Sequence, residues 1–291
     1  MVFVTGATGF VGNHVVKTLL AFGEKVRCLV RPGSEGRLRY AAEIVKGDIF
    51  SPDLAAKMAG CKAVIHLVGI IREFPQKGIT FKRLHVEATA RTLAAAKRAG
   101  IKKFIHMSAL GSSPEAETSY HQTKFQAEEL VRRSGLAYTI FRPSVIYGPY
   151  DQFTTMLAKI IKISPVIPIV GDGLYKLQPV HVHTVALGFT LALYLPTACN
   201  QIFEIGGPKA LTYREIVDNI ALRLKRKKRK VFLPVKPIKF ITAYAQHFSF
   251  YPLTEEILTM LLAGNVTTEG NFYRVFSLTP IKFQEGTGYL K

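Results

Sequence analysis

The chain has 291 residues, 48% of them apolar, and its 39 Lys and Arg residues outnumber the 20 Asp and Glu residues, which gives a net charge of +19. Such a composition excludes global disorder and supports a sizeable core. The three dispersed cysteines argue against a disulfide framework and for a reducing compartment. The positive charge favours anionic partners, whether phosphate cofactors, acidic lipid surfaces or nucleic acid.

Neither a targeting segment nor a membrane span is expected. The first strand-like run begins at Val2, which leaves no room for a signal or transit peptide. The best apolar stretch, "VALGFTLALYL", is too short for a membrane-spanning helix and ends at Pro196. The sequence therefore predicts a cytoplasmic protein, with peripheral attachment to the inner face of a membrane as the alternative.

The first half of the chain alternates continuous apolar runs, typical of buried strands, with amphipathic helical periods. Strands are expected at 2–6, 25–30, 42–48, 63–69, 102–110 and 137–143, and helices at 10–23, 51–60, 81–100 and 119–135. Continuous apolar strands separated by helices indicate an α/β fold, in which a doubly wound parallel sheet is covered on both faces.

A glycine-rich turn, "TGATGFVG", follows the first expected strand and opens the first helix. Gly6, Gly9 and Gly12 let the backbone turn sharply, let a pyrophosphate approach, and let the helix pack close to the strand. The pyrophosphate would then lie at the positive N-terminus of the helix. The pattern favours a Rossmann-type dinucleotide site over a tight turn without a ligand.

Basic residues follow the second expected strand, where NAD-specific sites usually place a carboxylate. Arg31 comes directly after the strand, with Arg37 and Arg39 close behind. A guanidinium suits a 2′-phosphate, so NADP(H) is the preferred coenzyme and NAD(H) the alternative; a solvated basic loop is the simpler interpretation. Asp48, after the third strand, is expected either to accept from the adenine amine or to cap a turn.

Tyr120 and Lys124 in "YHQTK" are four residues apart on an expected helix, so both side chains can point into one cleft. A phenol has a reference pKa near 10, and an adjacent ammonium together with a cationic nicotinamide would lower it toward the working pH. The preceding strand ends near Ser108. This spacing predicts an acid–base pair.

The second half of the chain is less regular. Segments rich in Pro and Gly follow Gly148, the run 177–195 looks like a return to the sheet, and Thr212 with Glu215 forms a capping box that opens a helix. Residues 225–291 are expected to form short helices and loops. We therefore expect two interleaved lobes: a dinucleotide-binding domain at 1–150 with a returning segment at 176–206, and a smaller α-rich substrate lobe at 151–175 and 207–291.

These motifs resemble those of the short-chain dehydrogenases/reductases of the extended or atypical kind. The resemblance rests on "TGATGFVG", "VIHLVG", "HMSALG", "YHQTK" and "IFRPSVIYGP", in that order. The segments "LVRPGSE", "LQPVHVHTVA", "FEIGGPKALTYREI" and "LTEEILTMLLAGNV" further resemble the subgroup of the nucleotide-binding accessory subunit of respiratory complex I and its bacterial relatives. The resemblance covers essentially the whole chain.

The resemblance implies a role for each matching residue. Around the coenzyme it implies pyrophosphate contacts by Thr5, Gly6, Gly9, Phe10, Val11 and Gly12, an adenosine-phosphate contact by Arg31, adenine contacts by Asp48 and Ile49, ribose contacts by Leu67, Val68 and Gly69, and nicotinamide contacts by Tyr120, Lys124, Pro143, Ser144 and Val145. Tyr120, Lys124 and Ser108 are the implied catalytic residues.

Two positions depart from the family pattern. The position of the serine or threonine that usually bonds the tyrosine aligns with Leu110, where Ser112 or Ser113 would have to substitute, and His85 replaces a frequent asparagine. The preferred prediction is an NADP(H)-binding oxidoreductase that transfers hydride to a carbonyl of an apolar, lipid or quinone-like substrate. The alternatives are a non-catalytic subunit that holds NADPH, with a respiratory-complex partner, and a nucleotide-sugar epimerase or dehydratase.

Two remaining features concern metal and surface partners. His181 and His183 alternate near a strand end, but no carboxylate or thiol completes a metal set, so packed histidines are expected. The basic segment 225–240, followed by Phe240, Tyr244, Phe248 and Tyr251 at helical spacing, predicts either contact with an anionic membrane or a solvated loop beside an aromatic core face. Nucleic acid ranks third because no recognition motif is present.

Overall fold

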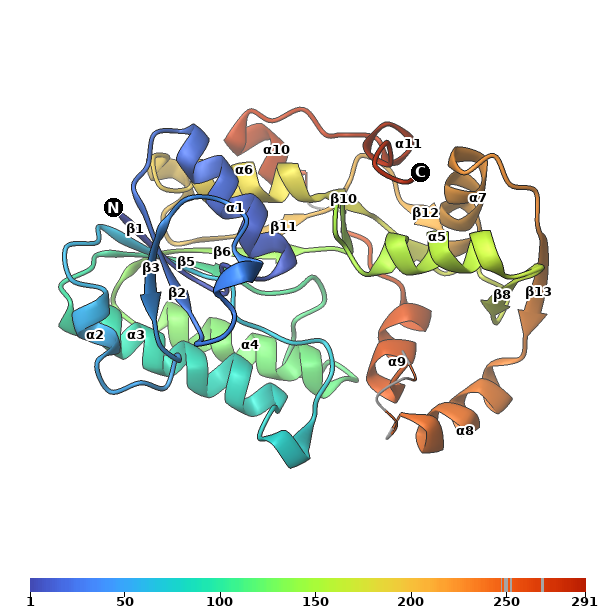
Figure 1. Cartoon of the computed structure of the whole chain (residues 1–291), viewed down its shortest axis with the longest axis horizontal. Coiled ribbons are helices and arrows are strands. Elements are labelled where there is room, and N and C mark those ends of the chain that lie inside the picture. Colours follow the sequence, from blue (N-terminus) through green and yellow to red (C-terminus); the bar gives the residue numbers. More distant parts are fainter. Residues whose placement is uncertain (247, 249–250, 252, 268–269) are drawn as a thin grey trace. The chain divides into compact units, whose positions relative to one another are not determined.

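The structure is a computed structural model that describes residues 1–246, 248, 251, 253–267 and 270–291. The chain forms two compact units that are interleaved in sequence. The first contains Met1–Pro143, Val182–Ile205 and Glu269–Thr279, and the second contains Ser144–His181, Gly206–Thr268 and Pro280–Lys291. Figure 1 shows the course of the chain through both units.

The first unit is built on a seven-stranded parallel sheet with the strand order β11-β6-β5-β4-β1-β2-β3. The strands are β1 Val2–Thr5, β2 Val26–Val30, β3 Glu43–Lys46, β4 Ala63–His66, β5 Lys103–Met107, β6 Ala137–Pro143 and β11 Gln201–Ile205. Their central members are apolar on both faces, as a parallel sheet between two helical layers requires. The predicted α/β doubly wound fold is confirmed.

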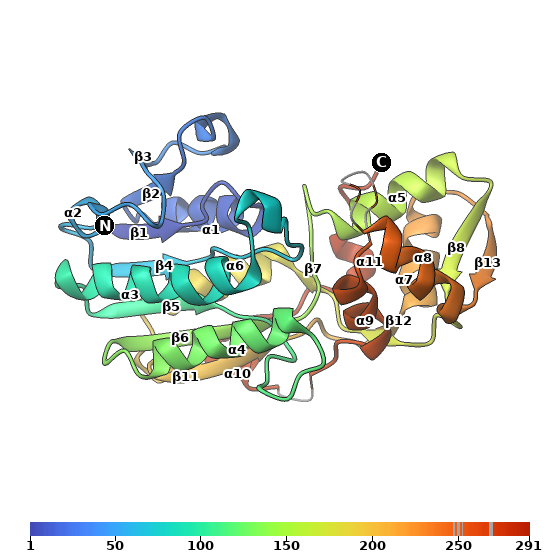
Figure 2. The same cartoon turned by 90° about the horizontal axis from the view of Figure 1, so that it is seen from below.

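Two helical layers cover the sheet: α1 and α6 lie on one face, and α3 and α4 on the other (Figures 1 and 2). The helices are α1 Phe10–Ala21, α2 Leu54–Lys57, α3 Ala88–Arg98, α4 Ser119–Arg132, α6 Val182–Leu191 and α10 Asn271–Phe276. A π-helical stretch, Lys82–Glu87, leads directly into α3. The order of β1 and β4 reverses the direction of winding, and ligands of doubly wound folds bind at this point.

The run 177–195 does not return to the sheet as a strand. It forms a two-residue strand, β10 Val180–His181, and then the helix α6, which packs along α1. Because α6 is apolar nearly all round, with Val182, Val185 and Phe189 fully buried, it shows no polar face and its period cannot distinguish helix from strand. The chain returns to the sheet only at β11.

The second unit has a separate apolar core, which includes Tyr147, Leu157, Ile161, Ile169 and Ile216. Its strands are β7 Ile146–Tyr147, β8 Val166–Val170, β9 Lys176–Leu177, β10, β12 Leu211–Thr212 and β13 Arg229–Leu233. Its helices are α5 Phe153–Ile163, α7 Tyr213–Arg223, α8 Val235–Ala245, α9 Glu255–Ala263 and α11 Phe283–Gly286.

Two sequence expectations in the second unit have different outcomes. The capping box at the start of α7 is confirmed, because Thr212 Oγ1 accepts from Glu215 N and the Glu215 carboxylate accepts from Thr212 N. The expectation of only helices and loops after residue 225 is wrong, because β13 pairs in parallel with β8. Lysines and arginines occupy the first part of β13, and they conceal its strand character.

The unit boundaries differ from residues 150 and 176, where the sequence placed them. Residues 144–150 and 176–181 belong to the second unit because β7 pairs with β10 and not with the large sheet. Residues 269–279 belong to the first unit, where the rings of Phe272 and Phe276 lie 6.0 and 5.6 Å from that of Phe141. No helix in the described part of the chain is long and apolar enough to cross a membrane.

Candidate nucleotide-binding and active site

The glycine turn after β1 is shaped by close backbone contacts. Gly6 has a φ of +74°, and a Cβ added there would lie 2.8 Å from the carbonyl carbon of Leu67. A Cβ on Gly12 would lie 2.1 Å from the carbonyl oxygen of Gly6, well inside van der Waals contact. Gly9 is exposed and is the N-cap of α1, whose first turn contains no acidic residue. The turn therefore presents bare backbone and a helix N-terminus, which fit a diphosphate.

The basic loop after β2 is anchored to the first helix. Arg31, Arg37 and Arg39 are all exposed. The buried side chain of Asn13 on α1 donates to Arg37 O at 3.1 Å and accepts from Arg39 N at 2.9 Å. Asn13 thereby fixes the basic loop beside the glycine turn. Sequence reasoning missed this residue, and no pattern in the sequence distinguishes it from a polar residue on a helix surface.

Asp48 follows β3 and has a local structural role. Its Oδ1 accepts from Phe50 N at 3.0 Å, and its own N donates to Ser51 Oγ at 3.0 Å. Of the two expectations for Asp48, the turn role is therefore observed. Ile49 is buried beside it, in the core of the first unit.

The residues after β4 lie against the turn. Leu67 is buried, and Leu67 N donates to Thr5 O at 3.1 Å, so the ends of β1 and β4 are held together. A Cβ on Gly69 would lie 2.9 Å from Lys124 Nζ. Because the strands are parallel, the segments after β1, β2, β3, β4 and β5 all lie at the carboxyl edge of the sheet. The first unit thus brings most of the predicted site residues to one edge.

Lys124 is buried on α4, and its Nζ donates to Met107 O, the last residue of β5, at 3.0 Å. Burial lowers the pKa of its ammonium to about 8, and the carboxylate of Glu128 opposes this shift. The amine therefore lies at the carboxyl ends of β4 and β5, with a pKa below that of an exposed lysine.

Tyr120 stands one turn before Lys124 on α4, in an aromatic setting. Its ring centroid lies 5.8 Å from that of Phe81, 5.4 Å from His85 and 5.1 Å from His121. Burial raises the pKa of its phenol to about 12. The expected lowering by Lys124 is thus not seen: desolvation is the cause of the shift, and Lys124 is not among its causes. The phenol is protonated at neutral pH.

His85, at the position where asparagine is frequent, connects three segments. Its Nδ1 lies 2.9 Å from Thr123 Oγ1, and its Nε2 lies 3.2 Å from Ile70 N. Nε2 also lies 3.1 Å from Ile70 O, so the ring bonds the Ile70 backbone through N or through O according to its tautomer. Burial and the charge of Lys124 lower the pKa of His85 to about 2, so the ring is neutral.

The serines of the predicted relay bond to one another and to other residues of the same loop. Ser108 Oγ and Ser112 Oγ lie 3.1 Å apart, and Ser112 Oγ donates to Ala109 O at 2.8 Å. Ser113 Oγ donates to the Glu115 carboxylate at 2.8 Å. Leu110, at the relay position, is buried, and its N donates to Pro143 O at 3.0 Å.

The last two predicted coenzyme residues belong to the second unit. Ser144 Oγ donates to Asn265 O at 3.1 Å, and Val145 O accepts from Val180 N at 3.0 Å. Both residues are thus fixed within the second unit. Their contact with a coenzyme remains a prediction from the family resemblance.

The histidines of "VHVH" separate into the two units. The ring of His181 on β10 packs edge-on against Tyr147, with centroids 5.2 Å apart, while His183 lies in the first turn of α6. No group of three or more His, Cys, Asp or Glu residues that could hold a metal occurs in the described part of the chain.

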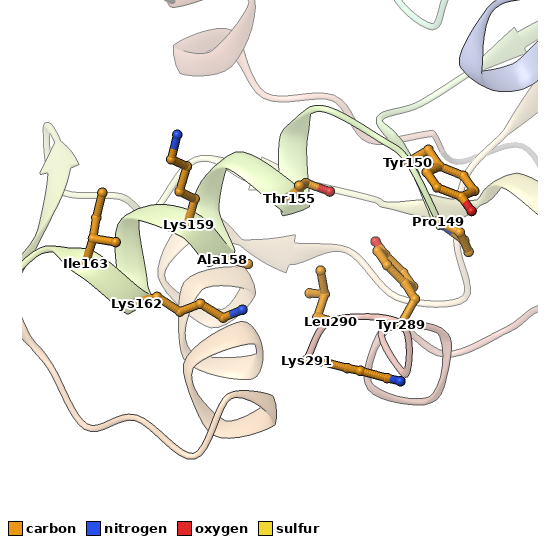
Figure 3. A pocket seen from close by; sticks show the side chains of 10 residues that line it. All are labelled: Pro149, Tyr150, Thr155, Ala158, Lys159, Lys162, Ile163, Tyr289, Leu290 and Lys291. Atoms are coloured by element: carbon orange, nitrogen blue, oxygen red, sulfur yellow. The ribbon is translucent and has the colours of Figure 1, made fainter. Parts of the chain in front are cut away.

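The second unit has a cavity of about 540 Å³ beside α5 (Figure 3). Apolar groups and lysines line it together, namely Pro149, Tyr150, Thr155, Ala158, Lys159, Lys162, Ile163, Tyr289, Leu290 and Lys291. Tyr289 Oη donates to the Asp151 carboxylate at 2.6 Å and so fixes one wall. These residues include none of the predicted site residues.

A doubly wound parallel sheet with a bare glycine turn after its first strand defines the class of Rossmann-type dinucleotide-binding folds. Within that class, the model of the NAD dependent epimerase/dehydratase family matches residues 2–206. The chain belongs to this family. The predicted resemblance to the extended short-chain dehydrogenases/reductases is thereby confirmed.

Three similar proteins narrow the subgroup. Ceramide reductase of Caulobacter vibrioides is 31% identical over 239 residues, covering 80% of this chain and 74% of that protein. The 40 kDa subunit of mitochondrial NADH-ubiquinone oxidoreductase of Neurospora crassa is 28% identical over 258 residues, covering 86% of this chain and 67% of that protein. Subunit 9 of the NADH dehydrogenase 1 alpha subcomplex of Arabidopsis thaliana is 30% identical over 253 residues, covering 82% of this chain and 62% of that protein. The chain thus spans less than two thirds of the plant subunit.

Solved structures support the fold. UDP-glucose 4-epimerase from Thermotoga maritima superposes with a TM-score of 0.79 at 20% identity, covering 99% of this chain and 96% of the other. UDP-glucuronic acid 4-epimerase from Bacillus cereus, in complex with NAD, has a TM-score of 0.78 at 19% identity, with the same coverage. At these identities the likeness concerns the fold alone.

Proposed function

We propose that the protein is an NADPH-dependent reductase that converts a carbonyl group of an apolar substrate to an alcohol. The observation that carries the proposal is the turn from Gly6 to Gly12, in which side chains at Gly6 and Gly12 would clash with the backbone and Gly9 begins the helix α1. The family supplies the coenzyme class. The likeness to a ceramide reductase supports a lipid-like substrate.

The arginine loop supports NADPH over NADH. Arg31 is exposed directly after β2, and Asn13 holds the following loop against α1. In this fold the end of the second strand faces the adenosine ribose, where a guanidinium can bind a 2′-phosphate through two hydrogen bonds. In addition, Glu35, the carboxylate nearest to Arg31 in the sequence, forms an ion pair with Lys46, whose Nζ lies 3.0 Å from Glu35 Oε1. Glu35 is therefore not the ribose-binding carboxylate that an NAD site would have at this place.

The phenol of Tyr120, which is protonated at neutral pH, can serve as the proton donor of a reduction. When bound, the reduced coenzyme supplies a hydride. Tyr120 Oη would give its proton to the oxygen of the substrate, and the resulting phenolate would take back a proton from solvent. Burial raises the pKa of the phenol to about 12 and so keeps the proton on Tyr120 until it is transferred. Lys124, with its amine at the end of β5, would position the nicotinamide ribose.

A second function is a subunit that holds NADPH without turnover. Leu110 supplies no hydroxyl at the relay position, and Ser112 and Ser113 donate to Ala109 O and to Glu115. The similarity to complex I subunits favours such a role, with a respiratory complex as the partner. Retention of the coenzyme turn is expected under both functions, so only turnover separates them.

The test uses protein freed of nucleotide, titrated with NADPH and NADH by calorimetry and assayed for NADPH oxidation with a long-chain ketone and with decylubiquinone. Tyr120→Phe should reduce turnover by about 100-fold or more and leave the NADPH Kd unchanged. Arg31→Ala should raise the Kd of NADPH by about tenfold or more and leave the Kd of NADH unchanged. Arg98→Ala, a change of an exposed arginine on α3, is the matched control for charge.

The outcomes separate the alternatives. Absence of heat with both coenzymes would refute coenzyme binding altogether. Tight NADPH binding without oxidation by either acceptor would favour the holding subunit. Equal loss of NADH and NADPH affinity in Arg31→Ala would contradict the 2′-phosphate contact.

A further inference from the structure

The helix α8 exposes its apolar side chains. Phe240, Ile241 and Tyr244 are 67%, 50% and 66% exposed, although they are large residues that normally pack inside. Of the helix, only Thr242 is buried. The sequence left open whether the aromatic residues form a core face, and the structure excludes that interpretation for α8. Phe248, which follows the helix, is 57% exposed.

The exposed residues of α8 form one face, with lysines at one edge and apolar side chains beside them. At 100° per residue, Lys239 and Lys236 lie at one edge, and Phe240, Tyr244 and Ile241 follow around the helix. The rings of Phe240 and Tyr244 are in contact, with centroids 5.1 Å apart. Thr242 faces the opposite way and lies 3.1 Å from Tyr251 Oη. We call the side chains of Lys236, Lys239, Phe240, Ile241 and Tyr244 the α8 face.

The surrounding segment is uniformly basic. Residues 223–254 contain nine lysines and arginines and no aspartate or glutamate. Lys225, Arg226 and Lys227, in the connection between α7 and β13, are exposed. One cation of the segment, Lys230, pairs with Asp218 outside it. Farther along, β13 exposes Phe232, which is 47% accessible and lies under the guanidinium of Arg214.

We propose that the α8 face docks on an anionic lipid bilayer. Aromatic and aliphatic side chains at the level of the headgroups, with lysines beside them, are the arrangement by which amphipathic helices lie in the plane of a membrane. Clustered lysines and arginines add attraction to anionic lipids. A second copy of this chain is a poorer occupant, because two such segments would bring nine positive charges against nine. The surface lies entirely in the second unit.

This docking is independent of the proposed reductase function, although it would bring the protein to a lipid-like substrate. The α8 face includes none of the predicted coenzyme residues, and variants of it should therefore keep the NADPH Kd of the wild type. Loss of vesicle binding with intact coenzyme binding, and the reverse, are then distinguishable outcomes.

The experiment is flotation of the full chain with vesicles of phosphatidylcholine alone, or of an equimolar mixture of phosphatidylcholine and phosphatidylglycerol. We expect recovery with the anionic vesicles only, decreasing as salt screens the charges. The double change Phe240→Ser with Tyr244→Ser should weaken the partition coefficient by about tenfold or more. The triple change of Lys227, Lys236 and Lys239 to Gln should do the same.

Matched controls remove equivalent groups elsewhere. Phe22 and Ile163 are 46% and 73% exposed, so changing both to Ser controls for loss of exposed apolar side chains. Lys25, Lys97 and Lys102 are exposed in the first unit, and their change to Gln controls for net charge. Both controls should float like the wild type, and thermal melting checks that every variant is folded.

Three results would overturn the proposal. The wild type could fail to float with anionic vesicles, or the control variants could lose as much binding as the α8 variants. Thirdly, sedimentation could show a dimer that the Phe240→Ser and Tyr244→Ser change dissociates, without any vesicle binding. That result would assign the α8 face to a second copy of the chain.

Discussion

His106, on β5, is a buried histidine whose ring nitrogens lack hydrogen-bond partners among the residues that the structure describes. Its neighbour His66 differs: Thr5 Oγ1 lies 2.8 Å from Nδ1, and Thr89 Oγ1 lies 3.2 Å from Nε2. The two rings stack with centroids 5.5 Å apart. A buried polar ring without partners costs about 1–3 kcal/mol.

We therefore predict that His106→Leu stabilises the protein by about 1 kcal/mol or more at pH 7, whereas His66→Leu destabilises it by about 1–3 kcal/mol, because it removes the side-chain partner of the buried Thr5 hydroxyl. Urea unfolding measures both. The matched pair controls for the loss of a histidine, and destabilisation by His106→Leu would show that its ring nitrogens are satisfied in solution.

The same histidines predict a pH dependence. Burial lowers the pKa of His66 to about 3 and that of His106 well below the ordinary value. In the unfolded chain they bind protons near pH 6.5, so the unfolded state gains protons first as the pH falls. The free energy of unfolding should thus decrease between pH 6.5 and about 3. His106→Leu should reduce that slope by about 1.4 kcal/mol per pH unit, the value for one proton.

At the scale of elements, the connection from β1 to α1 contains Gly6, Gly9 and Gly12, and the space for an added Cβ differs among them. Gly36, in the loop after β2, serves as the comparison. A Cβ would lie 2.1 Å from Gly6 O at Gly12 and 3.2 Å from it at Gly9, whereas Gly36 has nothing within 4 Å. We predict that Gly12→Ala weakens NADPH binding by about tenfold or more and lowers the Tm. Gly9→Ala should have a smaller effect on both quantities, and Gly36→Ala should change neither. Calorimetry and thermal melting give both readouts, and an equal effect of Gly9→Ala and Gly12→Ala would contradict the geometry.

The elements also show what the sequence could predict. The strands β1 to β6 and their helices follow from apolar runs, glycines and caps, since each of these is a local signal. The helix α6 was expected to be a strand of the sheet, because a fully buried helix and a buried strand are both apolar throughout. The strand β13 was missed because lysines at an edge hide its alternation. The roles of Asn13 and His106 depend on contacts between distant segments, and no local pattern encodes them.

The pKa of Tyr120 illustrates the same limit for chemistry. The spacing to Lys124 correctly placed both side chains on one helix, but the sign of the pKa shift depends on how much water the fold removes. Burial decided it. A charged neighbour can be read from spacing, whereas desolvation cannot.

At the scale of the whole molecule, each unit has its own core. Phe3, Val64 and Phe104 belong to the core of the first unit, and Leu157 and Ile169 to that of the second. The glycine turn, Arg31, Tyr120 and Lys124 all belong to the first unit. A coenzyme that binds these residues stabilises the unit that contains them.

We therefore predict that NADPH at about 100 times its Kd slows amide hydrogen exchange in β1, β4 and β5 by up to about 100-fold, since ligand binding adds about 2.7 kcal/mol to the unfolding free energy of this unit. The paired strands β8 and β13 should exchange nearly as before, because the only predicted coenzyme contacts of the second unit, Ser144 and Val145, lie outside these strands. Mass spectrometry of peptic peptides measures both regions, and NADH serves as the weaker ligand for comparison. Equal slowing in β8 and β13 would show that the two units unfold as one cooperative body, and no slowing in β1 would place the coenzyme elsewhere.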